Sequence, residues 1–483
     1  MLSNLQGNIL KGHGRDFTWN IFFRFGADTL LSKRAVRELG NYHVTDAYTQ
    51  LLANEAYKTE KKDGGTFLSL FLSSLGYAAL GLEFKAPEEN KAFESGMRDA
   101  SSIANLADPA VDNWEDAFKG PIHGMVLVAD DTPTRGVAAA EKIEEILTGA
   151  GAAVIHIQAG KALRNAVNLG IEHFGYVDGR SQPLMLLEDI EKESREDGIS
   201  RWDSGFPLGL ALVPDPLAKV RNPQTGDLGD VIADPTAFGS FFVFRKLEQN
   251  VAGFKTEEQR LANDLLLNGG QRLLAGALVV GRFEDGTPVT LSPSPKGGTP
   301  TNDFDYDGDL AASRCPFHAH VRKTNPRGTG GFEPEFNFHT PSALTERSRL
   351  MPRRGITYED TTRVPPTELP QVSSEEEFKE KVLHLLPSDG VGLLFMAYNS
   401  KLDQQFVFTQ QTWANNLGFP NIKPDPGRDG VIGQDGNIPG GQLFPKVWDD
   451  PASGTESFDF GKFVTMKGGE YFFAPSLVFL RNI

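Results

Sequence analysis

The chain of 483 residues is 39% hydrophobic and 23% charged, a composition typical of a soluble globular protein large enough for two domains. Its formal net charge of −16 argues against nucleic acid or an anionic membrane as the main partner, because both repel such a surface. The single cysteine, Cys315, excludes an intramolecular disulfide. We find neither a secretory signal nor an apolar stretch of bilayer-spanning length, and we therefore expect a cytoplasmic protein.

The first third of the chain predicts alternating strands and helices. Aromatic and β-branched residues indicate strands, and apolar residues spaced three and four apart indicate amphipathic helices. In chain order we expect a strand at 17–25, one or two helices within 27–56, strands at 65–73 and 124–130, a helix at 133–151 and a strand at 152–160. This order is that of a ferredoxin-like unit.

The pattern begins again after a stretch rich in glycine, proline and aspartate at 212–239. The second series comprises a strand at 241–250, a helix within 256–281, strands at 319–323 and 391–400, a helix at 400–418 and a strand at 470–476. We therefore predict an α+β fold of two similar units, 1–225 and 226–483. Two long loops, 283–312 and 352–372, are expected to carry site residues over the sheet.

Several common site motifs are missing or incomplete. Residues 302–309, "NDFDYDGD", begin like a calcium loop, but the twelfth position holds Arg314 where a bidentate carboxylate is required. The chain contains no phosphate-binding Gly-x-x-x-x-Gly-Lys-Ser/Thr and no Gly-x-Ser-x-Gly elbow. A calcium site, nucleotide hydrolysis and serine-type acyl transfer are therefore disfavoured.

Residues 313–328, "SRCPFHAHVRKTNPRG", place two histidines two positions apart among several cations. In a strand His318 and His320 would share one face and could chelate a single non-haem metal. Alternatively, one imidazole binds a haem iron while Arg322, Lys323 and Arg327 neutralise the haem propionates. A third interpretation is that both histidines have only a structural role.

Two loop segments favour a redox site. In "FGYVDGRSQP" (174–183), Asp178 lies between glycines on a tight turn, so the backbone presents its carboxylate. In "LMPRRGITYED" (350–360), Arg353 and Arg354 precede a glycine. Each segment alone is also compatible with an ordinary polar turn.

Together these segments resemble the dye-decolorizing peroxidases (DyP-type haem peroxidases), and the resemblance extends from "NLQGNILKGHGRD" to "EYFFAPS". Residues 175–179 match the family's Gly-x-x-Asp-Gly motif. His320 matches the proximal haem ligand, whereas His318 stands where the family usually has a small residue. The length and N-terminal sequence are similar to the longer, mostly intracellular branch. The resemblance implies two ferredoxin-like units with antiparallel sheets and peripheral helices, the haem lying in the C-terminal unit.

The resemblance also implies a function: a haem b peroxidase that reduces hydrogen peroxide and oxidises dyes, phenols and similar aromatic donors through a ferryl intermediate. Asp178 would shuttle the peroxide proton, and Arg353, with Arg354 as its rival, would stabilise the departing oxygen. Thr324 and Arg327 correspond to positions beside the haem and its propionates. Leu393 and Phe395 correspond to apolar residues of the distal side. Carboxylates stay ionised in mild acid, so activity should persist there.

Other features remain open at this level. Trp413, Tyr358 and Tyr398 are candidate electron relays from large donors at the surface, although each could be an ordinary core aromatic. Val407 stands where family members often carry an acidic residue that supports the proximal histidine, and Asp403 is a possible replacement. The alternatives to a peroxidase are a non-enzymatic haem-binding protein, for storage, sensing or iron release, and a non-haem metalloenzyme that uses His318 and His320. An oligomer is compatible with the sequence.

Overall fold

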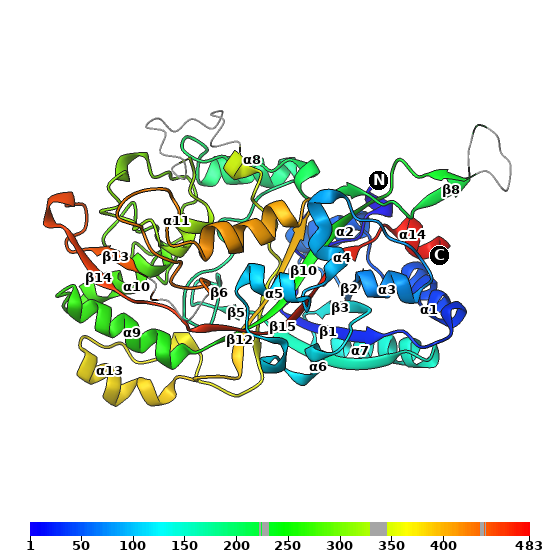
Figure 1. Cartoon of the computed structure of the whole chain (residues 1–483), viewed down its shortest axis with the longest axis horizontal. Coiled ribbons are helices and arrows are strands. Elements are labelled where there is room, and N and C mark those ends of the chain that lie inside the picture. The colour runs from blue at the N-terminus through cyan, green and yellow to red at the C-terminus, as the bar shows by residue number, and fades with distance from the viewer. Residues whose placement is uncertain (222–223, 225–230, 329–344, 435–438, 440) are drawn as a thin grey trace.

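An antiparallel sheet runs through the computed structural model, which describes residues 1–221, 224, 231–328, 345–434, 439 and 441–483 (Figure 1). Its strand order is β11-β12-β10-β15-β2-β3-β1-β4, with β7 paired to β10 outside this path. The four strands at each end have the order of a ferredoxin-like unit, and the pair β15 and β2 joins the two units. The α+β fold of two such units is therefore confirmed.

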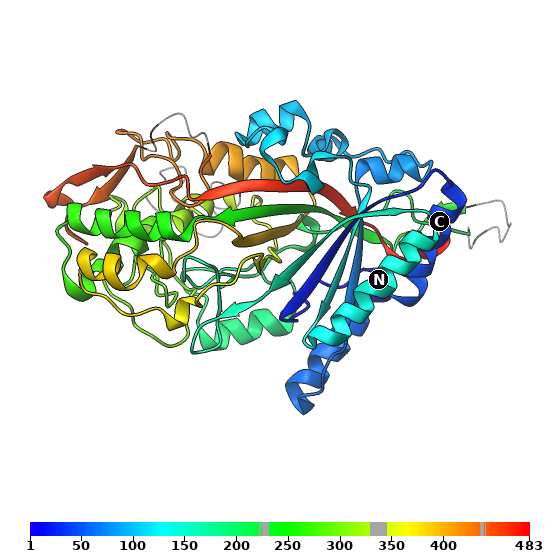
Figure 2. The ribbon, with the colours of Figure 1, turned by 90° about the horizontal axis from the view of Figure 1, so that it is seen from below.

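The N-terminal unit follows the predicted order closely. Its elements are β1 (Phe17–Arg24), α1 (Thr29–Tyr42), α2 (Ala47–Glu60), β2 (Phe67–Leu72), α3 (Ser74–Ala79), α4 (Lys91–Ser95), α5 (Ala100–Leu106), α6 (Asp116–Lys119), β3 (Gly124–Asp130), α7 (Pro133–Gly149) and β4 (Ala153–Lys161). Asp28 and Asp46 cap α1 and α2 by accepting backbone N–H bonds of the first turn. Helix α7 and the short helices α3 to α6 cover opposite sides of the sheet (Figure 2).

A long connection with little regular structure links the two units. It contains β5 (Leu163–Arg164), β6 (Gly170–Ile171), α8 (Leu187–Glu196), β7 (Val213–Pro214), β8 (Lys219–Arg221) and β9 (Val231–Ala233). The predicted unit boundary between 225 and 226 lies outside the described residues and stays a prediction. Asp178 belongs to this connection.

The C-terminal unit repeats the order with longer insertions. Its elements are β10 (Phe238–Gln249), α9 (Val251–Asp264), α10 (Leu273–Val280), α11 (His320–Thr324), β11 (Ile356–Glu359), α13 (Glu375–Lys381), β12 (Val391–Asn399), β13 (Gln442–Pro445), β14 (Thr455–Phe458), β15 (Val464–Ala474) and the terminal helix α14 (Leu477–Asn482). Strand β10 is the longest of the described strands and lies between β12 and β15, with most of its residues buried. It forms the floor on which the site is built.

The two edge strands of the sheet approach each other. The Thr357 hydroxyl, on β11, donates to the carbonyl of Lys161 at the end of β4 and accepts the Leu163 N–H at 3.2 Å. The sheet therefore curves into a barrel-like form whose closing edge lies beside the connection that carries Asp178.

Two predicted elements differ from the structure. Residues 319–323, predicted as a strand, form the start of helix α11, in which the Lys323 N–H donates to the Ala319 carbonyl at 2.8 Å. His318 and His320 therefore do not share a strand face. The helix predicted at 400–418 is present but π-helical over Asp403–Val407 and Thr409–Ala414. Among the described residues, no helix combines the length and apolarity needed to cross a membrane.

Candidate active site

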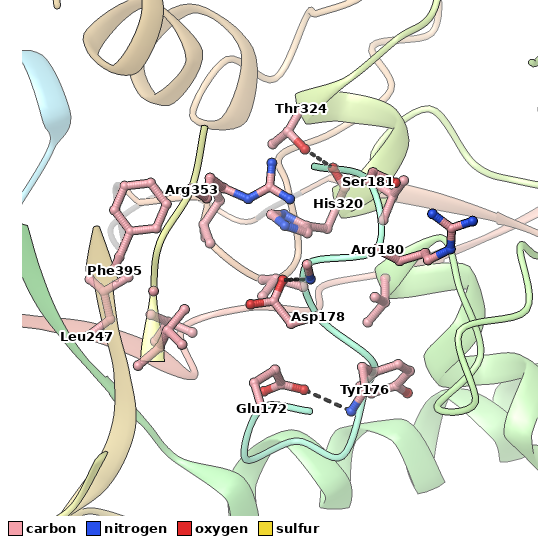
Figure 3. A pocket seen from close by; sticks show the side chains of 18 of the residues that line it. Glu172, Tyr176, Asp178, Arg180, Ser181, Leu247, His320, Thr324, Arg353 and Phe395 are labelled. Carbon is pink, nitrogen blue, oxygen red and sulfur yellow. Dashed lines mark hydrogen bonds between the residues drawn. The ribbon is translucent and has the colours of Figure 1, made fainter. Parts of the chain in front are cut away.

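A cavity of about 370 Å³ opens between α11, the floor of β10 and β12, and the turn that carries Asp178. Its size lies in the range of about 300–1,000 Å³ common for cofactor and small-molecule sites. Its polar wall includes Asp178, His320 and Arg353, whose side chains converge in Figure 3. Its apolar wall includes Leu247, Val280, Ile356, Leu393, Phe395 and Phe406.

Asp178 reaches the cavity because the backbone around it is held in an unusual shape. Gly175 and Gly179 adopt φ values of +100° and +79°, which residues with a Cβ rarely adopt. The Asp178 N–H donates to the Gly170 carbonyl at 3.0 Å. Its Oδ1 accepts the Gly179 N–H at 2.6 Å, and within the described part of the chain Oδ2 has no partner. One carboxylate oxygen is thus held while the other is available.

His320 is the first residue of α11 and is held by a carboxylate. Its Nδ1 lies 2.9 Å from Oδ2 of Asp429, whose side chain is fully buried. Burial lowers the pKa of His320, but the Asp429 charge and hydrogen bond outweigh it, so the net shift is upward. The side chain keeps 30% exposure because its other edge faces the cavity. Nε2 is therefore the nitrogen available to a ligand.

Asp429 was not among the residues predicted from the sequence. The predicted candidates for a carboxylate beside His320 were position 407, where Val407 stands, and Asp403 as a replacement. Asp403 instead accepts the N–H groups of Lys91 and Ala92, at 2.8 and 3.1 Å, so it is not the partner of His320. Asp429 Oδ1 accepts the N–H groups of Val431 and Ile432. The only signal was the turn sequence "PGRDG", which shows nothing of its distance from His320 in space.

The two adjacent arginines have different surroundings. The Arg354 guanidinium donates to the carbonyls of Asn8, Ile9 and Arg353. The Arg353 side chain lines the cavity and makes no hydrogen bond or ion pair to the described residues, whereas its backbone N–H donates to Oε1 of Gln182 at 2.9 Å. Of the two arginines, Arg353 is thus the one available to a ligand.

Three further predicted residues, Thr324, Leu393 and Phe395, also line the cavity. The predicted neutralising cations do not. Arg327 donates to the carbonyls of Asn302 and Phe304, and Arg322 pairs with Asp309 at 3.0 Å. Lys323 donates to the carbonyls of Asn416, Phe419 and Gly427. In this structure buried backbone carbonyls and an aspartate bind these cations, and the expected contact of Arg327 with a propionate stays a prediction.

His318 is directed away from the cavity. Its Nε2 donates to the Leu443 carbonyl at 3.2 Å, and its ring packs edge-on against Phe444. Burial lowers its pKa to about 3, so it is neutral. A pair of histidines chelating one ion is therefore contradicted. No group of three or more His, Cys, Asp or Glu side chains suited to a metal occurs among the described residues.

Comparison with known proteins identifies the family. Residues 4–162 match the DyP dimeric alpha+beta barrel domain. The chain is 44% identical to the multifunctional dye peroxidase DyP2 of Amycolatopsis sp., over all of this chain and 96% of that protein. The chain belongs to the dye-decolorizing peroxidases. It is therefore a haem peroxidase, an oxidoreductase that acts on peroxide, and not merely a haem carrier.

Solved structures of the family agree with this assignment over the whole chain. The structure of Amycolatopsis DyP2 superposes with a TM-score of 0.87 at 42% identity and covers all of this chain and 96% of that one. A DyP-type peroxidase of Anabaena sp. gives 0.86 at 37% identity, covering 100% and 94%. A dye-decolorizing peroxidase in complex with 2,6-dimethoxyphenol gives 0.73 at 28% identity, covering 100% and 98%.

Proposed function

We propose that this peroxidase binds haem b in the cavity through Nε2 of His320, reduces hydrogen peroxide with Asp178 and Arg353, and oxidises dyes, phenols and similar aromatic donors. The observation that carries the proposal is the convergence of three groups on one cavity: an imidazole held by a buried carboxylate, a carboxylate with one available oxygen and an arginine without a partner among the described residues.

The lining of the cavity suits a haem. Its apolar residues match the faces of a porphyrin, and His320 offers a single axial nitrogen. Arg349 also lines the cavity. Burial lowers its pKa, its guanidinium donates to the Gln404 carbonyl at 2.8 Å and lies over the Phe408 ring, and no described carboxylate pairs with it. A propionate would supply a negative charge, so Arg349 is a second candidate for a propionate contact, besides Arg327. When bound, haem supplies an iron that accepts peroxide and passes its oxidising power to donors.

Asp178 is suited to move the peroxide proton. Oδ2 accepts a proton from the peroxide oxygen that lies nearer the haem, while Oδ1 continues to accept the Gly179 N–H. Asp178 then gives that proton to the other peroxide oxygen, so the O–O bond can break with water as the leaving group. The apolar residues Leu393 and Phe395, which line the same cavity, limit the space for water and bulky donors.

Arg353 is suited to stabilise the charge that develops on the departing oxygen. Its backbone is held by Gln182 and by a bridge to Ala397 on β12, so the guanidinium needs no large rearrangement to act. In a cavity with apolar walls such a fixed cation stabilises a negative charge more strongly than it would in water, because the local dielectric constant is lower.

Aromatic donors are supported by the relative whose structure contains 2,6-dimethoxyphenol. For donors too large to enter, electrons would pass through the protein. The three relay candidates, Trp413, Tyr358 and Tyr398, are all buried, and Trp413 stacks on Phe419. They stay predictions, because burial alone does not distinguish a relay from a core residue.

The ligand assignment is tested with purified, haem-loaded protein. His320→Ala should lose the Soret band or shift it strongly, whereas His318→Ala should keep the wild-type Soret band. Electron paramagnetic resonance of the ferric protein should show loss of the axial nitrogen only in the first variant. A wild-type spectrum from His320→Ala would overturn the assignment.

A further inference from the structure

Glu172 makes four hydrogen bonds to the turn that precedes Asp178. Its Oε2 accepts the Phe174 N–H at 2.8 Å. Its Oε1 accepts the Tyr176 N–H at 3.0 Å (Figure 3). Its backbone carbonyl accepts the Gly175 N–H at 2.9 Å, and its backbone N–H donates to the Tyr176 carbonyl at 3.1 Å. One residue thus closes the whole turn 172–176.

This turn is one of the restraints on where the Asp178 carboxylate lies. The structure gives the Asp178 side chain one hydrogen bond, to the neighbouring Gly179 N–H. Because the donor is the next residue in the chain, this bond moves with the backbone and does not connect the side chain to another segment. The position of the carboxylate therefore depends on the path of residues 172–178. The Asp178 and Val177 N–H groups hold the end of this path by donating to the carbonyls of Gly170 and Glu284, at 3.0 and 3.2 Å, and the bonds of Glu172 close the turn before it, where Gly175 has a positive φ.

Glu172 also ties the turn to the second ferredoxin-like unit. Gln249, the last residue of β10, donates its side-chain amide to Oε2 of Glu172. Next to it, the Tyr176 hydroxyl donates to Glu258 on α9, and Lys255 bridges Glu258 and Glu284 at 2.9 and 2.6 Å. The turn is therefore attached to the same strand that forms the floor beneath the cavity.

The charge on Glu172 is costly where it lies. Burial raises the pKa of Glu172 to about 7, although the N–H groups of Phe174 and Tyr176, Gln249 and Lys255 oppose the shift. A neutral glutamine has nearly the same shape but only one acceptor oxygen, so it could not bind both N–H groups of the turn. The carboxylate is thus required by the geometry of the turn.

We propose that Glu172 is a positioning residue for catalysis: by binding the N–H groups of Phe174 and Tyr176 and the amide of Gln249, it holds the Asp178 carboxylate where peroxide is deprotonated. This inference rests on the proposed role of Asp178. It assigns Glu172 no contact with peroxide or the cofactor.

Glu470 provides a matched control. Its Oε1 also accepts two backbone N–H bonds, from Met97 at 2.8 Å and Tyr471 at 2.9 Å, and burial likewise raises its pKa. Glu470 does not line the cavity. Because both bonds go to one oxygen, which glutamine retains, Glu470→Gln measures the general effect of removing a buried carboxylate charge beside the backbone, without touching the Asp178 turn.

The experiment measures the second-order rate of the haem-loaded protein with hydrogen peroxide by stopped flow at the Soret band. Four variants are compared with wild type: Glu172→Gln, Asp178→Asn, the double variant and Glu470→Gln. We expect Glu172→Gln to be about 10–100-fold slower, with the KM for the aromatic donor unchanged. Asp178→Asn should be slower by about 10²–10⁴-fold. The double variant should be no slower than Asp178→Asn alone, because Glu172 acts through Asp178.

Amide hydrogen exchange gives a readout that does not depend on activity. The peptide covering 172–179 should exchange faster in Glu172→Gln. In Glu470→Gln it should exchange as in wild type, and because one amide oxygen can still accept both N–H groups, the peptides around 97 and 471 should change little. Should Glu172→Gln fold poorly, the reciprocal pair Glu172→Gln with Gln249→Glu keeps one buried charge and the side-chain bond. It should be equally slow, because the turn still lacks one acceptor.

The outcomes separate the two proposals. A wild-type rate in Asp178→Asn overturns the role of Asp178 itself. A slow Asp178→Asn with a wild-type rate in Glu172→Gln overturns the role of Glu172 alone. Equal slowing in Glu470→Gln, or a double variant slowed by the product of both factors, also overturns it, because Glu172 would then act through general stability or at another place.

Discussion

Nδ1 of His320 lies 2.9 Å from Oδ2 of Asp429, and that carboxylate is fully buried. The two residues are 109 positions apart and meet where α11 packs against the loop that follows the π-helical segment. Backbone N–H bonds from Val431 and Ile432 hold the carboxylate. The pair fixes which imidazole nitrogen faces the cavity, and it increases the electron density on that nitrogen.

Replacing Asp429 should change the reduction potential of the haem iron. Asp429→Asn removes the negative charge that strengthens electron donation by His320, so the ferric state is less stabilised and the Fe(III)/Fe(II) reduction potential should rise. Activity should fall by about 10–100-fold. Spectroelectrochemical titration measures the potential. Asp403→Asn, which alters a carboxylate bonded to Lys91 and Ala92, is the control and should leave the potential unchanged.

Of the two adjacent arginines, Arg353 should affect mainly the activity and Arg354 mainly the stability of the fold. Arg353→Leu should slow the reaction with peroxide by about 10²–10³-fold with little change in unfolding temperature, because the side chain serves only the cavity. Arg354→Leu leaves buried carbonyls without a donor, among them those of Asn8 and Ile9, and should lower the unfolding free energy by about 1–3 kcal/mol per lost partner. Stopped-flow rates and thermal unfolding of both variants test this, and the reverse pattern would assign Arg354 to the peroxide.

Arg349 should contribute to cofactor affinity and Arg327 to folding. Arg349→Leu removes the cation assigned to a propionate and should weaken haem binding by about 10–100-fold, the effect of one charge-assisted hydrogen bond. Transfer of haem to apomyoglobin measures that affinity. Arg327→Leu, which deprives the Asn302 and Phe304 carbonyls of their donor, should lower the unfolding temperature instead. Unchanged haem transfer from Arg349→Leu would contradict the assignment.

His13 should make stability depend on pH. Burial, and then Arg15 and Arg354, lower its pKa from 6.5 to about 3, so the folded protein keeps it neutral while the unfolded chain protonates it below about 6.5. The unfolded state therefore binds more protons between those values, and the unfolding free energy falls as the pH falls, by up to about 1.4 kcal/mol per unit. In His13→Asn this part of the slope should vanish. Urea unfolding from pH 8 to 4 measures it, and parallel curves for both proteins would refute the assignment.

The pattern of residues along the chain was sufficient to predict the fold. The strands at Phe17–Arg24 and Gly124–Asp130 and helix α7 follow their predicted ranges closely, because alternation and helical spacing are local properties. The repeated order of elements led to two ferredoxin-like units, as the strand order confirms. The motifs around Asp178, His320 and Arg353 also led to the family, since the residues next to each motif are part of its signature.

Other features depended on contacts between distant segments. The strand predicted at 319–323 is a helix, because the backbone hydrogen bond from Lys323 to Ala319 and the packing of the surrounding loops outweigh a short β-like pattern. Arg327 follows His320 in the same motif, but the sequence does not show that its guanidinium donates to the carbonyls of Asn302 and Phe304, more than 20 residues away. Asp429 carries no sequence signal that links it to His320. The sequence by itself therefore determined the order of elements and the identity of the reactive groups, which depend on near neighbours. Only the tertiary structure decided which charged groups face the cavity and which are neutralised within the fold, because that depends on which backbone and side-chain partners folding brings within hydrogen-bonding distance.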